Sequence, residues 1–172
     1  AEDTEIHGLQ EESLAGRPPF SADWEVFADR RERGPLAAHY SGAENSLLRA
    51  AWPYPRSSPD FARPGSRVAD WGPWIDSGRI YAQLYPDLES GRLEALVEAC
   101  GLQGDLDAHA SVHCPAGRRR YHAALYDAIA GALLLGSLSR HPQLASLTVM
   151  QLLALSTLDP RKRDSIVQRE LF

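Results

Sequence analysis

The sequence of 172 residues has few cysteines, a single lysine and no long apolar run. Its two cysteines, Cys100 and Cys114, are too few for a disulfide framework, so we favour reduced thiols in the cytoplasm. The longest purely apolar stretch, residues 128–136, falls well short of the roughly 20 residues that span a bilayer. No basic leader followed by an apolar run opens the sequence. These absences predict a cytoplasmic protein that has no membrane partner.

The composition is typical of one globular domain with a sizeable core, since 44% of the residues are hydrophobic and 24% are charged. A net charge of -5 argues against bulk attraction to nucleic acid, but it does not exclude an enzyme that acts on nucleic acid. Lys162 is the only lysine, so arginine, which suits bidentate phosphate contacts, carries nearly all the positive charge. The arginines gather within residues 30–33, 118–120 and 161–163. On these residues alone we favour an ordinary solvated surface.

Apolar spacing and turn residues predict mainly helices. We expect helices over residues 21–33, with Ser21 as N-cap, and over 43–51, 77–85, 91–100 and 105–113. Residues 36–38 fit a short buried strand, and the proline-rich and serine-rich residues 53–64 fit a loop. A longer helix is predicted over 119–140, and its segment 128–135 is apolar on every face, which predicts burial on all sides.

Asp127 lies at the start of this apolar segment, where an unpaired carboxylate would be costly. Such a carboxylate is a helix cap, an ion-pair member, a metal ligand or a catalytic group, and position alone favours a structural role. His122 precedes it by five residues, which is about 140° around an ideal helix. Both side chains reach one point only if His122 lies on a loop or in the first turn. A histidine above a metal-bound carboxylate is suited to activating water.

Residues 122–128, HAALYDA, resemble the last motif of the DEDDh 3′-5′ exonucleases, H-x-A-L-x-D-A. Four further stretches are similar to segments of this family and follow in the same order: residues 6–9 with 18–20, 36–44, 75–86 and 91–102. The resemblance implies an α/β fold, a ribonuclease H-like exonuclease domain over residues 1–142, followed by a helical tail over 143–172. The family's first motif, D-x-E on the opening strand, is absent. We therefore expect an N-terminally incomplete domain that is helix-rich because its first strands are missing.

The resemblance also implies two-metal hydrolysis of phosphodiester bonds with Mg²⁺ or Mn²⁺. In this interpretation His122 is the general base, and Asp127 and Glu44 are metal ligands. Glu44 stands where the family has aspartate, which shifts the carboxylate by one methylene. Two further carboxylates would have to come from outside these residues, so we expect the chain alone to be inactive. The predicted activity is release of nucleoside monophosphates from 3′ ends, in proofreading, repair or end-trimming.

The expected substrate is the 3′ end of single-stranded DNA or RNA, and the family resemblance does not choose between them. Arg118, Arg119 and Arg120 are the candidate contacts to nucleic acid. A second interpretation is a nucleic-acid-binding or scaffold module that keeps this fold without catalysis. The altered Glu44 and the missing first motif are the features on which the two interpretations divide.

The sequence ends in Q-x-x-L-F, which resembles the short peptides that dock bacterial replication and repair proteins on the sliding clamp. Gln168, Leu171 and Phe172 would be the anchors of this contact. A terminal helix that packs Leu171 and Phe172 on its own domain is the alternative, and the residues alone favour it.

Other polar and aromatic residues have simpler interpretations. His39 suits a structural role after the predicted strand, and Asp76 suits the N-cap of the helix that follows it. Two cysteines and two histidines do not match the paired spacing of zinc ligands: Cys100, His109, His113 and Cys114. Three tryptophans can either stack on bases or pack in the core: Trp52, Trp71 and Trp74.

Overall fold

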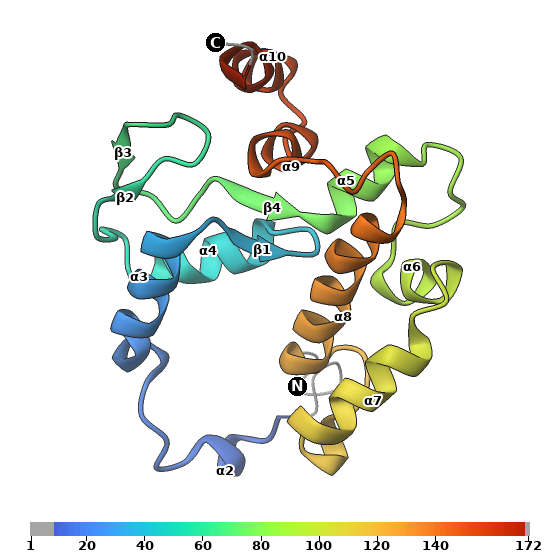
Figure 1. Cartoon of the computed structure of the whole chain (residues 1–172). Coiled ribbons are helices and arrows are strands. Elements are labelled where there is room, and N and C mark those ends of the chain that lie inside the picture. Colours follow the sequence, from blue (N-terminus) through green and yellow to red (C-terminus); the bar gives the residue numbers. More distant parts are fainter. Residues whose placement is uncertain (1–8, 171–172) are drawn as a thin grey trace.

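The structure, a computed structural model, describes residues 9–170 and is an α/β fold rich in helix with little sheet (Figure 1). The first half of the chain carries the strands and three helices. They are α2 (Glu11–Leu14), α3 (Trp24–Arg33), β1 (Leu36–Ala38), α4 (Gly42–Ala51), β2 (Ser58–Pro59), β3 (Arg67–Val68) and β4 (Trp74–Asp76). The second half is helical. It contains α5 (Ser77–Leu84), α6 (Leu93–Ala99), α7 (Gln103–His113), α8 (Ala124–Ser137), α9 (Val149–Leu155) and α10 (Pro160–Glu170).

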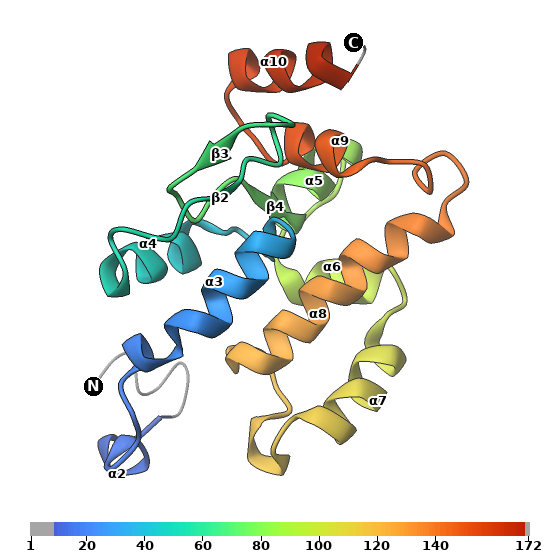
Figure 2. The same ribbon diagram turned by 60° about the vertical axis from the view of Figure 1, so that its left-hand side comes forward.

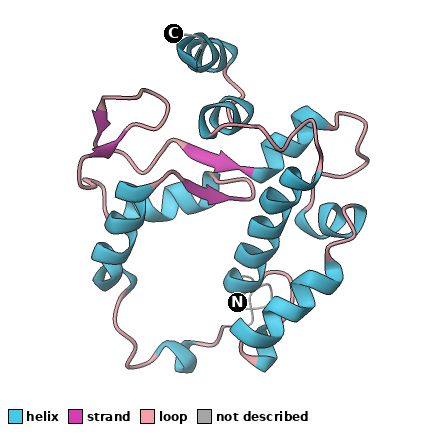
Figure 3. Cartoon of the chain, viewed as in Figure 1, coloured by secondary structure: helices cyan, strands magenta, loops and turns pink. Residues whose placement is uncertain are grey.

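The strands form two separate pairs (Figure 3). β1 and β4 are parallel, with Leu36 opposite Trp74 and Ala38 opposite Asp76. β2 and β3 are antiparallel and belong to the connection between them. Both strands of a parallel pair end at the same edge, so the residues that follow Ala38 and Asp76 are brought together. The predicted strand over 36–38 is confirmed, but it is only half-buried and Ala37 is exposed.

The predicted helices over 43–51, 77–85, 91–100 and 105–113 are confirmed as α4 to α7, with ends that differ by one or two residues. The first predicted helix begins later, at Trp24, because residues 20–23 form a 3₁₀ turn in which the Ala22 amide bonds the Pro19 carbonyl. Ser21 lies inside this turn, so its prediction as N-cap is wrong. The helix ends at Arg33, where the Gly34 amide bonds the Arg30 carbonyl.

Helix α8 begins at Ala124 and not at residue 119, and a 3₁₀ turn continues it over Leu138–Arg140. The prediction that it is buried on all sides is wrong, because Ala128, Ala132 and Gly136 are exposed along one face. The buried face carries Tyr126, Ala130 and Leu134, which pack in one core with residues of α5, α6 and α7. Figure 2 shows α8 beside α6 and α7. Small alanine and glycine side chains expose little apolar area, so one face of α8 can meet water at small cost.

A second cluster joins α3, α4 and the segment before β4 through aromatic residues. Trp71 is fully buried, Trp52 nearly so, and the Trp71 indole N–H donates to the Trp52 carbonyl at 3.0 Å. The core interpretation therefore holds for these two tryptophans, whereas Trp74 is half-buried. Arg31 is buried within the same region and donates to the carbonyls of Pro59, Trp71 and Gly72. Its assignment to a surface patch with Arg30 and Arg33 is wrong.

The C-terminal segment packs on β4. Helix α9 begins with a capping box made by Thr148 and Gln151, and it buries Leu153 and Ala154. The hydroxyl of Ser156, at its end, accepts a bond from the Asp76 amide at 2.8 Å. In Figures 1 and 2, α9 and α10 lie above β4, and in Figure 1 most of α8 lies below β1. Within residues 9–170, no helix has the length and apolar character needed to cross a membrane.

Candidate active site beside the parallel strands

The turn between β1 and α4 is held by one buried carboxylate. Asp76, which has 0% exposure, accepts bonds from the amides of Tyr40 and Ser41, each at 3.0 Å, and from the Ser41 hydroxyl. It also accepts from the Arg79 amide, as the N-cap of α5, so the predicted capping role is confirmed. The Arg79 side chain lies 3.4 Å from the same carboxylate. Asp76 thereby fixes the segment that leads from β1 into Glu44.

His39, the first residue after β1, uses both ring nitrogens inside the protein. Its Nε2 lies 2.9 Å from the Gly91 carbonyl and its Nδ1 lies 3.0 Å from the Ser77 hydroxyl. Since a carbonyl only accepts, Nε2 carries the hydrogen and Nδ1 is left to accept from Ser77. Burial lowers the pKa of His39, while the hydrogen bond to Gly91 acts in the opposite direction. A neutral ring in a positioning role fits these contacts.

Tyr40 adopts a left-handed backbone with φ of 55°. Its ring packs against two glycines, and a side chain at either of these positions would collide with the Tyr40 side chain. A Cβ on Gly78 would lie 2.8 Å from the ring, and a Cβ on Gly91 would clash with the phenol oxygen. These glycines therefore admit the tight turn at the end of β1, a requirement that has no local signal in the residues around Tyr40.

His122 and Asp127 form the second part of the site. His122 lies on the turn before α8, with φ of 66°, and its amide donates to both Asp127 carboxylate oxygens, at 3.1 and 3.3 Å. The helix begins only at Ala124, so His122 lies on the loop before it. From this position its amide reaches the Asp127 carboxylate. A left-handed residue other than glycine costs of order 1 kcal/mol, and the Asp127 carboxylate is the contact that holds it.

Asp127 is half-buried and His122 is exposed. Burial raises the pKa of the Asp127 carboxyl above its ordinary value, while the nearby His122 and the hydrogen bond from its amide oppose that shift. Glu44, which is exposed in the first turn of α4, also raises it. The fold thus brings the charges of Glu44 and Asp127 within electrostatic reach of each other and of two histidines.

The candidate metal ligands do not make a complete site by themselves. Among residues 9–170, no group of three histidine, cysteine, aspartate or glutamate side chains is placed to hold a metal ion. Glu44 and Asp127 are two carboxylates, and both oxygens of Asp127 already face the His122 amide. A metal ion bound here would need further oxygen ligands from elsewhere.

The predicted nucleic-acid contacts lie on the turn that leads to His122. Arg119 is exposed, but its guanidinium donates to the carbonyls of Ser111 and Cys114 and so joins the turn to the end of α7. Arg120 is exposed and Arg118 is half-buried. Gln168 is exposed on α10, while Leu171 and Phe172, like Ile6, His7 and Gly8 of the first similar stretch, lie outside the described residues.

No family model, curated protein or solved structure matches this chain, so its own residues are what indicate a function.

Proposed function

We propose that this chain is part of a metal-dependent 3′-5′ exonuclease of the DEDDh type, with a ribonuclease H-like arrangement of its parallel strands. One observation carries the proposal. Asp127 accepts the bonds of the His122 amide at the start of α8, and Glu44, in the first turn of α4, lies within electrostatic reach of Asp127 and of His39 at the edge where β1 ends. Open α/β sheets bind their ligands at this edge. The substrate is the 3′ end of a single-stranded nucleic acid, and the protein is expected to act in the cytoplasm.

In this proposal Asp127 and Glu44 hold Mg²⁺ or Mn²⁺ together with carboxylates from outside the described residues. The ions supply Lewis-acid activation of water and of the terminal phosphate when they are bound. His122 takes the proton from the attacking water, because its ring is exposed while its backbone is held by Asp127. Arg120, on the same turn, contacts a phosphate of the strand.

The expected result is that His122→Ala lowers the rate of stepwise 3′ degradation by about 100-fold or more, the usual contribution of a general base. Asp127→Asn is expected to abolish degradation without unfolding the protein. The folded protein raises the pKa of Asp127, so the ionised carboxylate lowers the free energy of unfolding at neutral pH. Asparagine carries no charge and removes this cost. The measurement follows labelled single-stranded DNA with Mg²⁺ or Mn²⁺ in the full-length native protein, with urea unfolding beside it.

His109→Ala is the matched control, since His109 is exposed on α7, where its ring stacks on His113, and it should leave the rate unchanged. Degradation that survives both His122→Ala and Asp127→Asn would contradict the proposal. A protein that binds DNA and degrades none with either metal would support the second interpretation, a non-catalytic binding or scaffold module. The bond from the His122 amide to Asp127 favours that alternative, because it gives the carboxylate a structural task.

The proposal extends to the C-terminal peptide as a contact to the sliding clamp. Gln168 is exposed on α10, so its amide is open to a partner. Removing Leu171 and Phe172 is expected to abolish clamp binding, measured by surface plasmon resonance with the purified clamp, and to leave DNA degradation unchanged. Removing the exposed Val167 side chain as Val167→Ala, outside the three anchors, should have no such effect. Full clamp binding by the truncated chain would contradict the assignment.

A further inference from the structure

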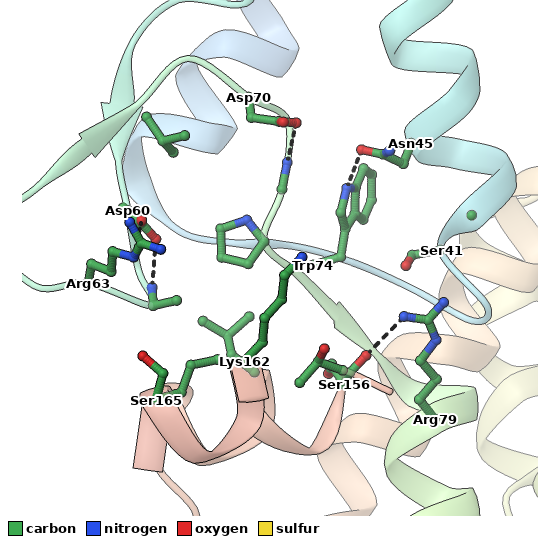
Figure 4. A pocket seen from close by; sticks show the side chains of 18 of the residues that line it. Ser41, Asn45, Asp60, Arg63, Asp70, Trp74, Arg79, Ser156, Lys162 and Ser165 are labelled. Atoms are coloured by element: carbon green, nitrogen blue, oxygen red, sulfur yellow. Dashed lines mark hydrogen bonds and ion pairs between the residues drawn. The ribbon is translucent and has the colours of Figure 1, made fainter. Parts of the chain in front are cut away.

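A cavity of about 660 Å³ lies between α4, β4, the segment before β4 and the helices α9 and α10 (Figure 4). Asn45 lines it from α4, Ser41 from the turn before α4, Trp74 from β4, and Ser156 and Lys162 from the C-terminal segment. In Figure 4 the Lys162 side chain extends from α10 toward Trp74. Binding sites for small ligands have volumes in this range, so a ligand of nucleotide size can enter.

The lining of this cavity is basic although the whole chain is acidic, with a net charge of -5. Five cationic side chains face two carboxylates: Arg49, Arg63, Arg79, Arg161 and Lys162 against Asp60 and Asp70. Arg49 is bound to Asp70 at 2.9 Å, and Arg63 lies 3.8 Å from Asp60. Within the described part of the chain, the side chains of Arg161 and Lys162 have no ion pair. This unpaired excess attracts an anion into a concave surface.

The cavity also has an aromatic wall whose orientation is fixed. The Trp74 indole N–H donates to the Asn45 side-chain oxygen at 2.9 Å. Trp74 is only half-buried, unlike Trp52 and Trp71, and it lines the cavity. A fixed indole beside unpaired cations is the combination by which proteins hold single-stranded nucleic acid, through base stacking and phosphate contact together. An acidic peptide would use the cations and leave the indole face without a partner.

We propose that this cavity binds a nucleotide, with its phosphate on Arg161 and Lys162 and its base against Trp74. The ligand is either a free mononucleotide or one nucleotide of a single strand, since both carry the same phosphate and base. This binding does not depend on the proposed exonuclease activity. Glu44, His122 and Asp127 do not line the cavity, which is formed with α9 and α10 and not with α8.

The test measures fluorescence anisotropy of a short labelled oligothymidylate with the full-length protein in EDTA and on the Asp127→Asn background, so that no degradation occurs. Arg161→Gln with Lys162→Gln is expected to weaken binding at least about fivefold and to reduce the slope of log K against log salt by about 1.4, as expected for two lost phosphate contacts on a single strand. The control is Arg140→Gln with Arg163→Gln, which has the same net charge. Both of these arginines are exposed, paired with Asp105 and Asp164, and absent from the cavity.

An abasic oligonucleotide with the same phosphates is expected to bind about tenfold more weakly, because stacking on an aromatic side chain supplies that difference. Displacement of the oligonucleotide by thymidine monophosphate supports a mononucleotide site, and its failure to displace supports a strand site. Equal losses in the two double variants would overturn the proposal, since only general charge would then matter. Equal binding of the abasic strand, or no binding at all, would overturn it as well.

Discussion

Replacing Asp76 by alanine is expected to lower the free energy of unfolding by about 4 kcal/mol, because it removes a buried charge on which several donors depend. The carboxylate is fully buried and accepts from the amides of Tyr40, Ser41 and Arg79. Alanine would leave these amides, and the nearby Arg79 guanidinium, without their acceptor. A buried donor without a partner costs its full desolvation.

The measurement is urea unfolding of the wild type and the variant, followed by tryptophan fluorescence. Asp105→Ala is the matched control, because Asp105 forms an exposed ion pair with Arg140 at 3.0 Å and should change stability by less than about 1 kcal/mol. Asp76→Asn is expected to fall between the two, since the amide oxygen keeps part of the acceptor set. If Asp76→Ala were no worse than Asp105→Ala, the turn after β1 would be held by other contacts.

Arg31→Leu is expected to lower the free energy of unfolding by about 3 kcal/mol, because it leaves three carbonyls in buried or half-buried positions without their donor. Arg31 has 1% exposure, and its guanidinium donates to the carbonyls of Gly72 at 2.6 Å, Pro59 at 2.9 Å and Trp71 at 3.2 Å. It also lies 5.2 Å from the centre of the Phe61 ring. Burial lowers the pKa of Arg31, and nearby carboxylates act in the opposite direction.

Thermal unfolding distinguishes this role from a surface role. Arg30→Leu, the adjacent change on the exposed face of α3, should leave the midpoint nearly unchanged. Arg31→Lys should also be destabilised, because an ammonium cannot reach three acceptors with the fixed fork of a guanidinium. A stable Arg31→Lys variant would show that charge alone suffices at this position.

Most helices could be predicted from the sequence because their apolar spacing is local. The turn before α8 could not, since His122 takes a left-handed backbone that is supported by the bond from its amide to Asp127. The burial of Arg31 could have been predicted from its helical spacing, although its place in a run of charged residues suggested a surface position. Arg31 follows Trp24, Phe27 and Ala28 by seven, four and three residues, so it shares their buried or half-buried face of α3.

The candidate site was only partly predictable for a related reason. The motif around His122 and Asp127 is contiguous, and the second carboxylate follows a short apolar strand, so both have local signals. The cavity is formed by α4, β4, α9 and α10, which are far apart in the sequence. The spacing of residues within any one of these elements does not indicate which basic side chains meet in the cavity. Strands of two residues, such as β2 and β3, are likewise fixed by tertiary contacts and not by propensity.

The parallel pairing of β1 with β4 also sets an order of events during folding. Parallel strands cannot be joined by a tight hairpin turn. The chain between β1 and β4, which includes α4, β2 and β3, must therefore form a long loop before Ala38 can pair with Asp76. Closing such a loop carries an entropic cost that the short contacts between α7 and α8 avoid. We therefore expect the helical half to form its contacts early, and the Tyr40 turn with Glu44 to reach its final geometry late, when the strands close over Asp76.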